Sequence, residues 1–296
     1  MRRIVWLLET ILFFILSIPL AILPYRASMK TGEFLGLLLF SVWKSRRRIA
    51  IENLRNSIEA KSIVISEPIE KIIKDNFKNL GRSFAEIIKI SYGLGGKIIN
   101  SVEFEGIENF HMAHSKGRGV ILVTGHCGNW ELMAIATPLK IKKIAFIARP
   151  IDNPYINRFI EKVRERHGNT LIYKKGAIRV IMRALKKGGC IGILIDQAVF
   201  SSEGYIIDFL GRRAWTTKMP ALIAKRIGSA VLPIFIHRTV RGHTIKIYPE
   251  VELSRIDGEN AIIEDTRRFS EYIERYIRYH PSEWLWIHKR WKRSDS

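Results

Sequence analysis

Residues 120–131 read Val-Ile-Leu-Val-Thr-Gly-His-Cys-Gly-Asn-Trp-Glu, and this stretch decides how the rest of the chain is interpreted. The aliphatic run 120–123 predicts a buried strand, and the small and polar residues after it predict a turn into a helix. Asn129 suits the N-cap of that helix, and Glu131 suits its first turn. The stretch therefore predicts a strand, a loop that carries His126, and a helix.

The junction also brings together two residue types that carry acid–base chemistry. His126 and Glu131 are separated by about 500° on an ideal helix, so they do not share a helical face. They can meet only if His126 precedes the helix and Glu131 lies in its first turn. A carboxylate on one ring nitrogen fixes the histidine tautomer and stabilises the imidazolium, as a general base requires. The sequence thus predicts that Glu131 orients His126 as a base.

Short apolar runs alternate with amphipathic segments after residue 101, and this predicts an α/β fold. The expected further strands are 144–147, 191–195 and 231–236, and the expected helices are 130–138, 153–167, 176–187, 217–227 and 260–279. Such alternation requires crossover connections, so we expect a mixed, largely parallel sheet flanked by helices. Residues 244–251 alternate with period two and are predicted to form an edge strand.

The N-terminal segment 1–26 predicts a membrane-anchoring helix. Its apolar run, 4–24, has about the 20 residues that a bilayer-spanning helix needs, and Glu9 is its one charge. A cleaved signal peptide is the main alternative, although no small-x-small site follows, and a buried helix is the other. Residues 101–296 would form the α/β domain.

Between these parts, residues 27–100 are expected to be helical and partly apposed to the membrane. The apolar stretch 34–43 is too short to span a bilayer, and it leads directly into the basic cluster 44–48. Basic residues beside an apolar helix favour acidic head groups and the cytoplasmic side.

The composition limits the classes of protein that remain. The chain has 49 Lys and Arg against 28 Asp and Glu, a net charge of +21, and 47% hydrophobic residues. This hydrophobic content excludes a disordered chain, and the charge suits an anionic membrane surface or a nucleic acid. Cys127 and Cys190 are too few for a disulfide framework or a four-cysteine zinc site. Walker, dinucleotide, zincin and serine-hydrolase motifs are absent from the sequence.

The His-Cys-Gly-Asn-Trp-Glu segment resembles the H-x-x-x-x-E motif of the lysophospholipid acyltransferase superfamily. Further segments, in the same order, resemble its lipid A biosynthesis (lauroyl or myristoyl) acyltransferases and their phosphatidylinositol mannoside relatives. These segments are 46–54, 148–154, 196–197 with 209–211 and Thr216, 231–233, and 281–291. The motif alone is weak, but the resemblance covers nearly the whole chain.

The resemblance implies a glycerolipid acyltransferase-like fold and O-acyl transfer. The expected donor is an acyl-carrier-protein or coenzyme A thioester, and the acceptor is a hydroxyl of an anionic glycolipid such as a lipid A precursor. A phosphatidylinositol mannoside or a lysophospholipid is the alternative acceptor. No metal, cofactor or nucleic acid is expected, and the catalytic domain would lie on the cytoplasmic side of the inner membrane, against its anionic surface.

Several further residues are predicted to support the transfer. Arg149 and the backbone N–H groups near Gly128 and Asn129 are candidate donors to the oxyanion of a thioester reaction. Asp196 and Gln197 follow a predicted strand, so they either line the donor or acceptor site or cap the next turn.

The segment around Gly211 is expected to be a loop near the acceptor. Arg212 and Arg213 would either grip acceptor phosphates or be surface charge, and Thr216 follows in the same block.

Three alternatives remain open at this point. A Cys127–His126 thiol enzyme is possible in principle, although adjacent side chains rarely face each other. A basic nucleic-acid-binding protein would fit the charge but lacks a recognisable motif. A non-catalytic membrane scaffold would need a degenerate site. The tail tryptophans Trp284, Trp286 and Trp291, interleaved with basic residues, suit a membrane interface, which the resemblance favours, or stacked nucleobases. Core packing is the alternative for Trp284 and Trp286.

Overall fold

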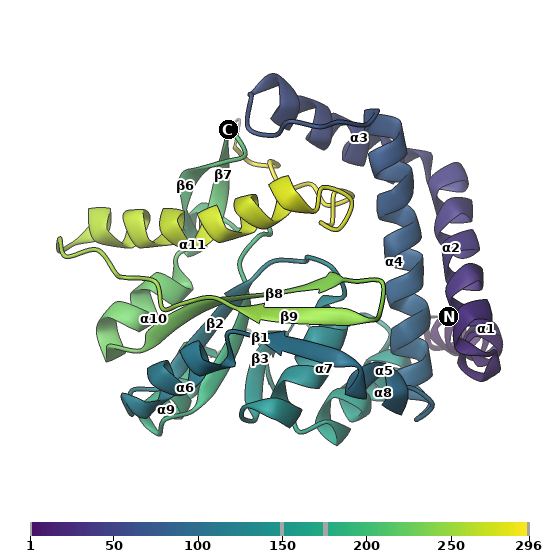
Figure 1. The fold of residues 1–296 in the computed structure, drawn as a ribbon, viewed down its shortest axis with the longest axis horizontal. Helices are drawn as coiled ribbons and strands as arrows, with labels where there is room; N and C mark the ends of the chain where they lie inside the picture. Colours follow the sequence, from purple (N-terminus) through teal and green to yellow (C-terminus); the bar gives the residue numbers. More distant parts are fainter. Residues whose placement is uncertain (1, 149–150, 174–176, 295–296) are drawn as a thin grey trace.

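The computed structural model describes residues 2–148, 151–173 and 177–294, and its centre is a seven-stranded sheet (Figure 1). The strand order is β1-β9-β8-β2-β5-β3-β4. Neighbouring strands are parallel except for β8 and β9, which pair in the antiparallel direction. The strands are β1 (Val102–Glu105), β2 (Val120–Thr124), β3 (Ile144–Ala148), β4 (Thr170–Tyr173), β5 (Cys190–Leu194), β8 (Ala230–Arg238) and β9 (His243–Ile247). The predicted α/β fold with a mixed, largely parallel sheet is confirmed.

Helices cover both faces of this sheet, because successive side chains of a strand point to opposite faces. Ile121 and Val123 of β2 belong to one apolar cluster, and Val120 and Leu122 belong to the other. Helices α9, α10 and α11 contribute to the first cluster, and α5, α6 and α7 to the second. The helices of this part are α5 (Gly96–Asn100), α6 (Ile107–Ser115), α7 (Trp130–Lys140), α8 (Pro154–Arg166), α9 (Ala177–Lys186), α10 (Met219–Ile227) and α11 (Glu259–Tyr279).

The prediction of an edge strand at 244–251 is wrong. β9 lies inside the sheet, where it is antiparallel to β8 on one side and parallel to β1 on the other. The edge position belongs to β1, a four-residue strand too short to give a periodic signal. The sequence also did not predict β4 or the separate hairpin of β6 (Gly204–Phe209) and β7 (Arg212–Thr217).

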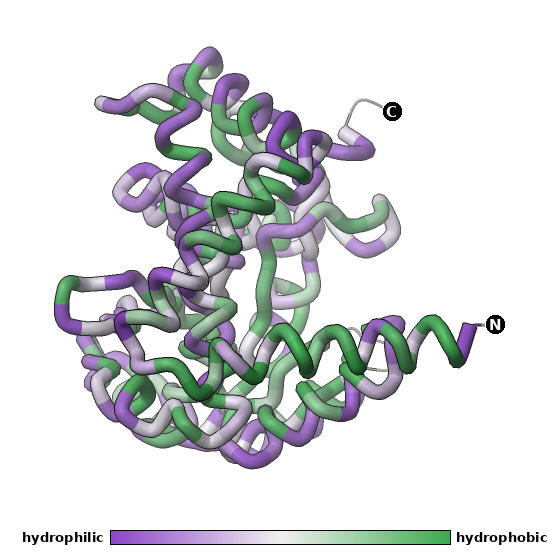
Figure 2. Tube along the Cα trace, turned by 90° about the vertical axis from the view of Figure 1, so that its right-hand side faces the viewer, coloured by the Kyte–Doolittle hydropathy of each residue, from purple (hydrophilic) through white to green (hydrophobic). Residues whose placement is uncertain are grey.

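The N-terminal part of the chain, which comes before α5 and the sheet, contains the helices α1 (Arg2–Ile22), α2 (Tyr25–Val42), α3 (Lys44–Glu59) and α4 (Ile69–Ser91). Within the described part of the chain, α1 is the one helix long and apolar enough to cross a membrane, and only 17% of its apolar window is buried. Figure 2 shows α1 extending from the body with mainly hydrophobic residues along it. It is therefore a candidate membrane anchor.

The α1 helix is also joined to the α/β part. Phe159 of α8 packs edge-on against Phe13 and Phe14. The side chain of Asn153, which caps the N-terminus of α8, donates to the Trp6 carbonyl and to the carboxylate of Glu9 at 2.9 and 3.1 Å. The single charge in the apolar run thus has a hydrogen-bond partner in the α/β part.

Helices α2 and α4 approach each other so closely that their backbones touch (Figure 1). A Cβ atom at Gly81 would lie 2.0 Å from the Gly32 carbonyl oxygen, and one at Gly36 would lie 2.2 Å from the Phe77 carbonyl oxygen. Small residues spaced by four along a helix permit such close packing. These glycines therefore set the distance between α2 and the rest of the protein.

We predict that Gly81→Ala separates α2 from α4 and lowers stability by about 1–3 kcal/mol, the usual cost of overpacking. The measurement is the midpoint of chemical unfolding in detergent. Gly96→Ala is the matched control, because a Cβ there meets no atom within 4 Å. Equal midpoints for the two variants would contradict the close-packing argument.

Candidate active site

His126 lies where the sequence predicted it, on the loop between β2 and α7. Asn129 is the N-cap of α7, and its Oδ1 accepts the backbone N–H of Leu132 at 3.1 Å. Glu131 is in the first helical turn. Gly128 has a φ of 55°, a left-handed conformation that glycine adopts at low cost and that lets the chain turn into the helix.

The carboxylate on His126 belongs to Asp196. His126 Nδ1 is 2.7 Å from Asp196 Oδ1, and the backbone N–H of His126 donates to Oδ2 at 2.8 Å. Trp284 Nε1–H donates to the same Oδ2 at 2.8 Å. Asp196 follows β5, the parallel neighbour of β2, so the carboxyl ends of the two strands bring these side chains together.

These contacts shift the pKa of Asp196 and the pKa of His126. Burial alone would raise the pKa of Asp196, but the charge and the hydrogen bonds of His126, with the Trp284 donor, hold it well below its usual range. Burial would lower the pKa of His126, yet the Asp196 carboxylate overrides it and the pKa is raised, with a smaller contribution from Glu131. A carboxylate on Nδ1 makes Nδ1 the donor, so Nε2 keeps its lone pair for a proton. The pair is thus arranged as a general base.

Glu131 lies in the predicted helical turn, but its carboxylate does not contact His126. Its Oε1 accepts Nη2 of Arg164 on α8 at 2.7 Å, and its Oε2 accepts Nε at 3.3 Å. The prediction that Glu131 orients His126 is therefore wrong. The first turn of α7 directs Glu131 towards α8, whereas Asp196 reaches Nδ1 from the adjacent strand. A catalytic role for Glu131 beside the histidine stays a prediction.

Of the other predicted residues, some lie beside His126 and some do not. Gln197 lies in the site, with its Nε2 3.2 Å from His126 Nε2, so Asp196 and Gln197 both contact the histidine. The N–H of Gly128 donates to the Glu283 carbonyl at 2.8 Å, so it is not available to an oxyanion. Arg149 lies outside the described residues.

The third predicted block is a β-hairpin rather than a ligand loop. Leu210 and Gly211 form its two-residue turn, both with positive φ, as such hairpins favour. The Arg212 guanidinium stacks on the ring of Trp291 at 4.5 Å, and Arg213 is exposed on β7. Thr216 is fully buried and its hydroxyl accepts from Arg290, so it cannot reach a substrate.

The C-terminal segment contacts the loop that carries His126. The Leu285 N–H donates to the His126 carbonyl at 3.1 Å, and Trp284 forms a β-bridge with Cys127. Trp284 and Trp286 are 1% and 0% exposed, and Trp291 is also buried. The core interpretation of Trp284 and Trp286 is confirmed, and the membrane-interface interpretation is wrong for all three, since Trp291 is also buried.

A second buried carboxylate, Glu86 of α4, was missed by the sequence analysis. It accepts both terminal nitrogens of Arg238 at 2.6 and 2.8 Å, Asn129 Nδ2 at 2.9 Å and the Tyr25 hydroxyl at 3.0 Å. Burial raises the pKa of Glu86, but His243 and Arg238 outweigh it and lower the pKa to about 2. In sequence, Glu86 resembles any polar residue of an amphipathic helix. In space it ties α4 to the cap of α7.

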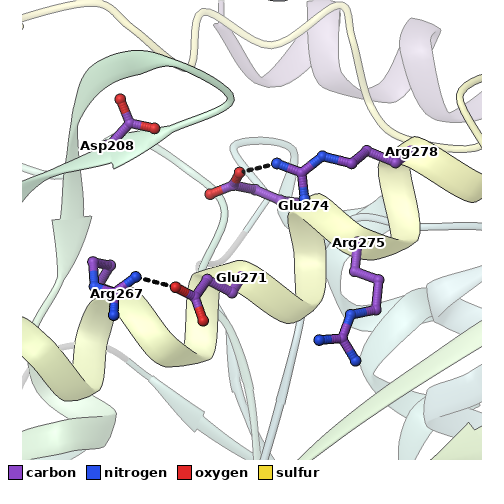
Figure 3. A pocket seen from close by; sticks show the side chains of 6 residues that line it. All are labelled: Asp208, Arg267, Glu271, Glu274, Arg275 and Arg278. Atoms are coloured by element: carbon purple, nitrogen blue, oxygen red, sulfur yellow. Dashed lines mark hydrogen bonds and ion pairs between the residues drawn. The ribbon is translucent and has the colours of Figure 1, made fainter. Parts of the chain in front are cut away.

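A groove of about 330 Å³ between β6 and α11 is separate from this chemistry (Figure 3). Its lining is charged throughout: Asp208, Arg267, Glu271, Glu274, Arg275 and Arg278. Arg278 pairs with Glu274 at 2.8 Å and Arg267 pairs with Glu271 on the same helix. The groove lacks an apolar wall for a lipid, so we assign the site to His126.

Comparison with known proteins identifies the family of the chain. The model of the family described as bacterial lipid A biosynthesis acyltransferase matches residues 2–293. The chain belongs to this family. The matched residues include α1, the His126 loop and the C-terminal segment up to residue 293.

Individual relatives are distant but cover most of the chain. The lipid A biosynthesis palmitoleoyltransferase of Escherichia coli is 26% identical over 280 residues, 91% of this chain and 86% of the relative. The lauroyltransferase of the same organism is 24% identical over 274 residues, 91% and 87% of the two chains. The phosphatidylinositol mannoside acyltransferase of Mycolicibacterium smegmatis is 21% identical over 226 residues, 75% and 73%. All are acyltransferases by name.

We predict that Cys127 resists alkylation in the folded protein. The thiol is buried, and burial together with the negative charges of Asp196 and Glu283 raises its pKa well above the usual range, so no thiolate forms near neutral pH. The measurement is iodoacetamide treatment at pH 8, followed by peptide mass spectrometry. The same treatment in denaturant is the control and should modify both cysteines. Rapid modification of native Cys127 would revive the thiol-enzyme hypothesis.

Proposed function

We propose that this protein transfers a fatty acyl chain from a thioester donor to a hydroxyl of a glycolipid at a membrane surface, with His126 as the general base. The observation that carries the proposal is the buried Asp196–His126 pair at the carboxyl ends of adjacent strands, in a chain of the lipid A acyltransferase family. Asp196 takes the orienting place first predicted for Glu131.

In the proposed reaction, His126 Nε2 removes the proton of the acceptor hydroxyl while its oxygen attacks the thioester carbonyl. Asp196 stays ionised and stabilises the imidazolium that forms. The tetrahedral oxyanion then collapses, the carbon–sulfur bond breaks, and the thiolate takes the proton from Nε2. The products are an ester and a free thiol, and the enzyme returns to its starting state without a covalent intermediate.

The oxyanion needs donors other than Gly128. The backbone amides of Trp130 and Glu131 at the start of α7 are the proposed donors, because helix N-termini present N–H groups and a positive dipole end to an anion. The N–H of Leu132 is not among them, since it donates to Asn129 Oδ1. Glu131 lies on this first turn of α7 and pairs with Arg164 of α8, whose guanidinium would be a fixed positive charge near the site. An acyl carrier protein and coenzyme A both present the acyl group as a thioester, so the same chemistry accepts either donor.

The acceptor is proposed to be an anionic glycolipid of the lipid A precursor kind. The palmitoleoyl- and lauroyltransferases of lipid A biosynthesis support this choice, and the phosphatidylinositol mannoside acyltransferases make that glycolipid the second candidate. The two share a sugar hydroxyl beside phosphate groups, which suits a chain with a net charge of +21.

The enzyme is proposed to act at the cytoplasmic face of the inner membrane. The α1 helix exposes Leu8 and Leu12 at 61% and 57%, and α2 exposes Phe34 at 63%. The basic residues Lys44 and Arg48 at the start of α3 are also exposed. Apolar and basic surfaces at adjoining helices suit insertion beside acidic head groups.

We predict that His126→Ala and Asp196→Asn each reduce acyl transfer by about 10²–10⁴-fold, the usual contribution of a positioned base. The double variant should be little worse than either single variant, because the two residues act as a unit. The measurement is ester formation from radiolabelled acyl thioester and a lipid A precursor, by thin-layer chromatography.

His111→Ala is the matched histidine control, since His111 is exposed on α6. It should keep wild-type activity. Unchanged transfer by purified, folded His126→Ala would refute the mechanism.

We predict that the membrane attachment has a hydrophobic part and an electrostatic part. The double variant Leu8→Asp/Leu12→Asp should float with anionic vesicles at low salt but be released at 1 M salt, where the Debye length is ~3 Å. The wild-type protein should stay bound in 1 M salt, because hydrocarbon burial is not screened. Each aspartate costs about 3 kcal/mol in a membrane-inserted helix, and each surface cation contributes about 1 kcal/mol.

Lys44→Glu/Arg48→Glu is the complementary variant, and it spares Arg46 and Arg47, which bond to backbone carbonyls. It should bind in a salt-independent way. Release of the wild-type protein by salt would show that α1 is not inserted.

A further inference from the structure

The C-terminal segment makes three hydrogen bonds to the catalytic loop and its carboxylate. The Glu283 carbonyl accepts the Gly128 N–H, and the Leu285 N–H donates to the His126 carbonyl. Between these two backbone bonds, Trp284 extends its indole to Asp196 Oδ2. The segment therefore contacts the loop at His126 and Gly128 and also contacts the Asp196 carboxylate, although it lies more than 150 residues after the motif in the sequence.

The position of the indole N–H is fixed by its surroundings. The Trp284 ring lies edge-on to Trp286 at 4.7 Å between ring centroids, and it also contacts Phe209 at 5.7 Å and Trp291 at 6.2 Å. Trp284 is 1% exposed. A ring held on three sides cannot turn its N–H away, so the donor is preorganised for Asp196.

The hydrogen bond from Trp284 helps to determine which neighbour each oxygen of the Asp196 carboxylate faces. Oδ2 accepts the backbone N–H of His126 and the indole N–H, and Oδ1 faces His126 Nδ1. Two donors on Oδ2 oppose rotation of the carboxylate about its Cβ–Cγ bond. Rotation would move Oδ1 away from Nδ1 and leave the tautomer and the direction of Nε2 unspecified.

The other charged groups near the pair come from the loop, α7 and the tail. Glu131 interacts electrostatically with His126, and Arg290 and His288 of the tail interact electrostatically with Asp196. Arg290 is fully buried, and burial lowers its pKa to about 10, so it remains a cation. Burial lowers the pKa of His288 to about 4, so it is neutral near pH 7. Neither of these tail groups replaces the Trp284 bond, because neither has a hydrogen bond to Asp196 among the described residues.

We propose that Trp284 is a positioning residue of the acyl transfer, which holds Asp196 so that Asp196 holds His126. The proposal rests on the proposed function in taking His126 as the base. Loss of the indole donor would loosen the carboxylate and leave more of its negative charge facing the imidazole. His126 would then bind its proton more tightly and be less well directed.

The test compares Trp284→Phe with Trp286→Phe. Both tryptophans are buried in the same segment, but Trp286 Nε1 donates to the Pro281 carbonyl and not to Asp196. Trp284→Phe should lower kcat by about tenfold with little change in KM, the effect of losing one hydrogen bond to a charged group. In an Asp196→Asn background it should have no further effect, because its action passes through Asp196.

A second readout does not need acyl transfer. Diethylpyrocarbonate modifies neutral histidine, so the pH dependence of His126 modification, followed by peptide mass spectrometry, reports the midpoint of its titration. Trp284→Phe should raise this midpoint and slow modification by about threefold at pH values below it. Trp286→Phe should leave the midpoint in place.

A third variant keeps the test valid if the phenyl ring packs poorly. Benzothienylalanine at position 284 has the shape of tryptophan and lacks the N–H donor, so it should reproduce both effects of Trp284→Phe. An unchanged midpoint and unchanged kcat in this variant would overturn the proposal.

The outcomes for the base and for the positioning residue are separate. If His126→Ala abolishes transfer while the position-284 variants behave like Trp286→Phe, the proposed function stands and Trp284 is only a core residue. If the position-284 variants shift the His126 midpoint while His126→Ala still transfers acyl groups, the coupling stands and the proposed function falls.

Discussion

A buried carboxylate is the constraint around which this protein is arranged. Asp196 is 2% exposed, and an ionised carboxylate in the interior costs several kcal/mol unless donors surround it. Its donors come from two separate places, the His126 loop and the C-terminal segment. The His126 loop, the end of β5 and the tail therefore assemble around one charge, and separating them would leave the Asp196 carboxylate without these donors.

A comparable constraint joins the N-terminal helices to the same loop. Glu86 accepts from Arg238, Asn129 and Tyr25, which belong to β8, the cap of α7 and the start of α2. The α1 helix reaches the α/β part through Asn153, and α8 in turn supplies Arg164 to Glu131. The candidate anchor and the catalytic loop are thus connected through polar contacts and not merely through the chain.

These contacts explain which site predictions failed. Glu131 has the spacing of a partner for His126, but the side chain on Nδ1 is set by strand order, and β5 is the neighbour of β2. Arg212 and Thr216 looked like acceptor contacts because the hairpin that contains them has no clear strand pattern. Once β6 and β7 pair, Thr216 faces the buried Arg290. The tail tryptophans resembled an interfacial belt because sequence alone does not show that they pack together.

The sequence by itself determined the α/β class, the strand-loop-helix junction at His126, the N-cap at Asn129 and the apolar N-terminal helix. These depend on local periodicity, capping and hydrophobic length, and each of these patterns is contained in a stretch of about 20 residues. Tertiary structure alone decided the partner of His126, the internal position of β9 and the burial of Trp284. Each of these depends on which distant segments become neighbours: Asp196 and Trp284 are far from His126 in sequence, and only the parallel register and the packing of the tail bring three donors to one carboxylate.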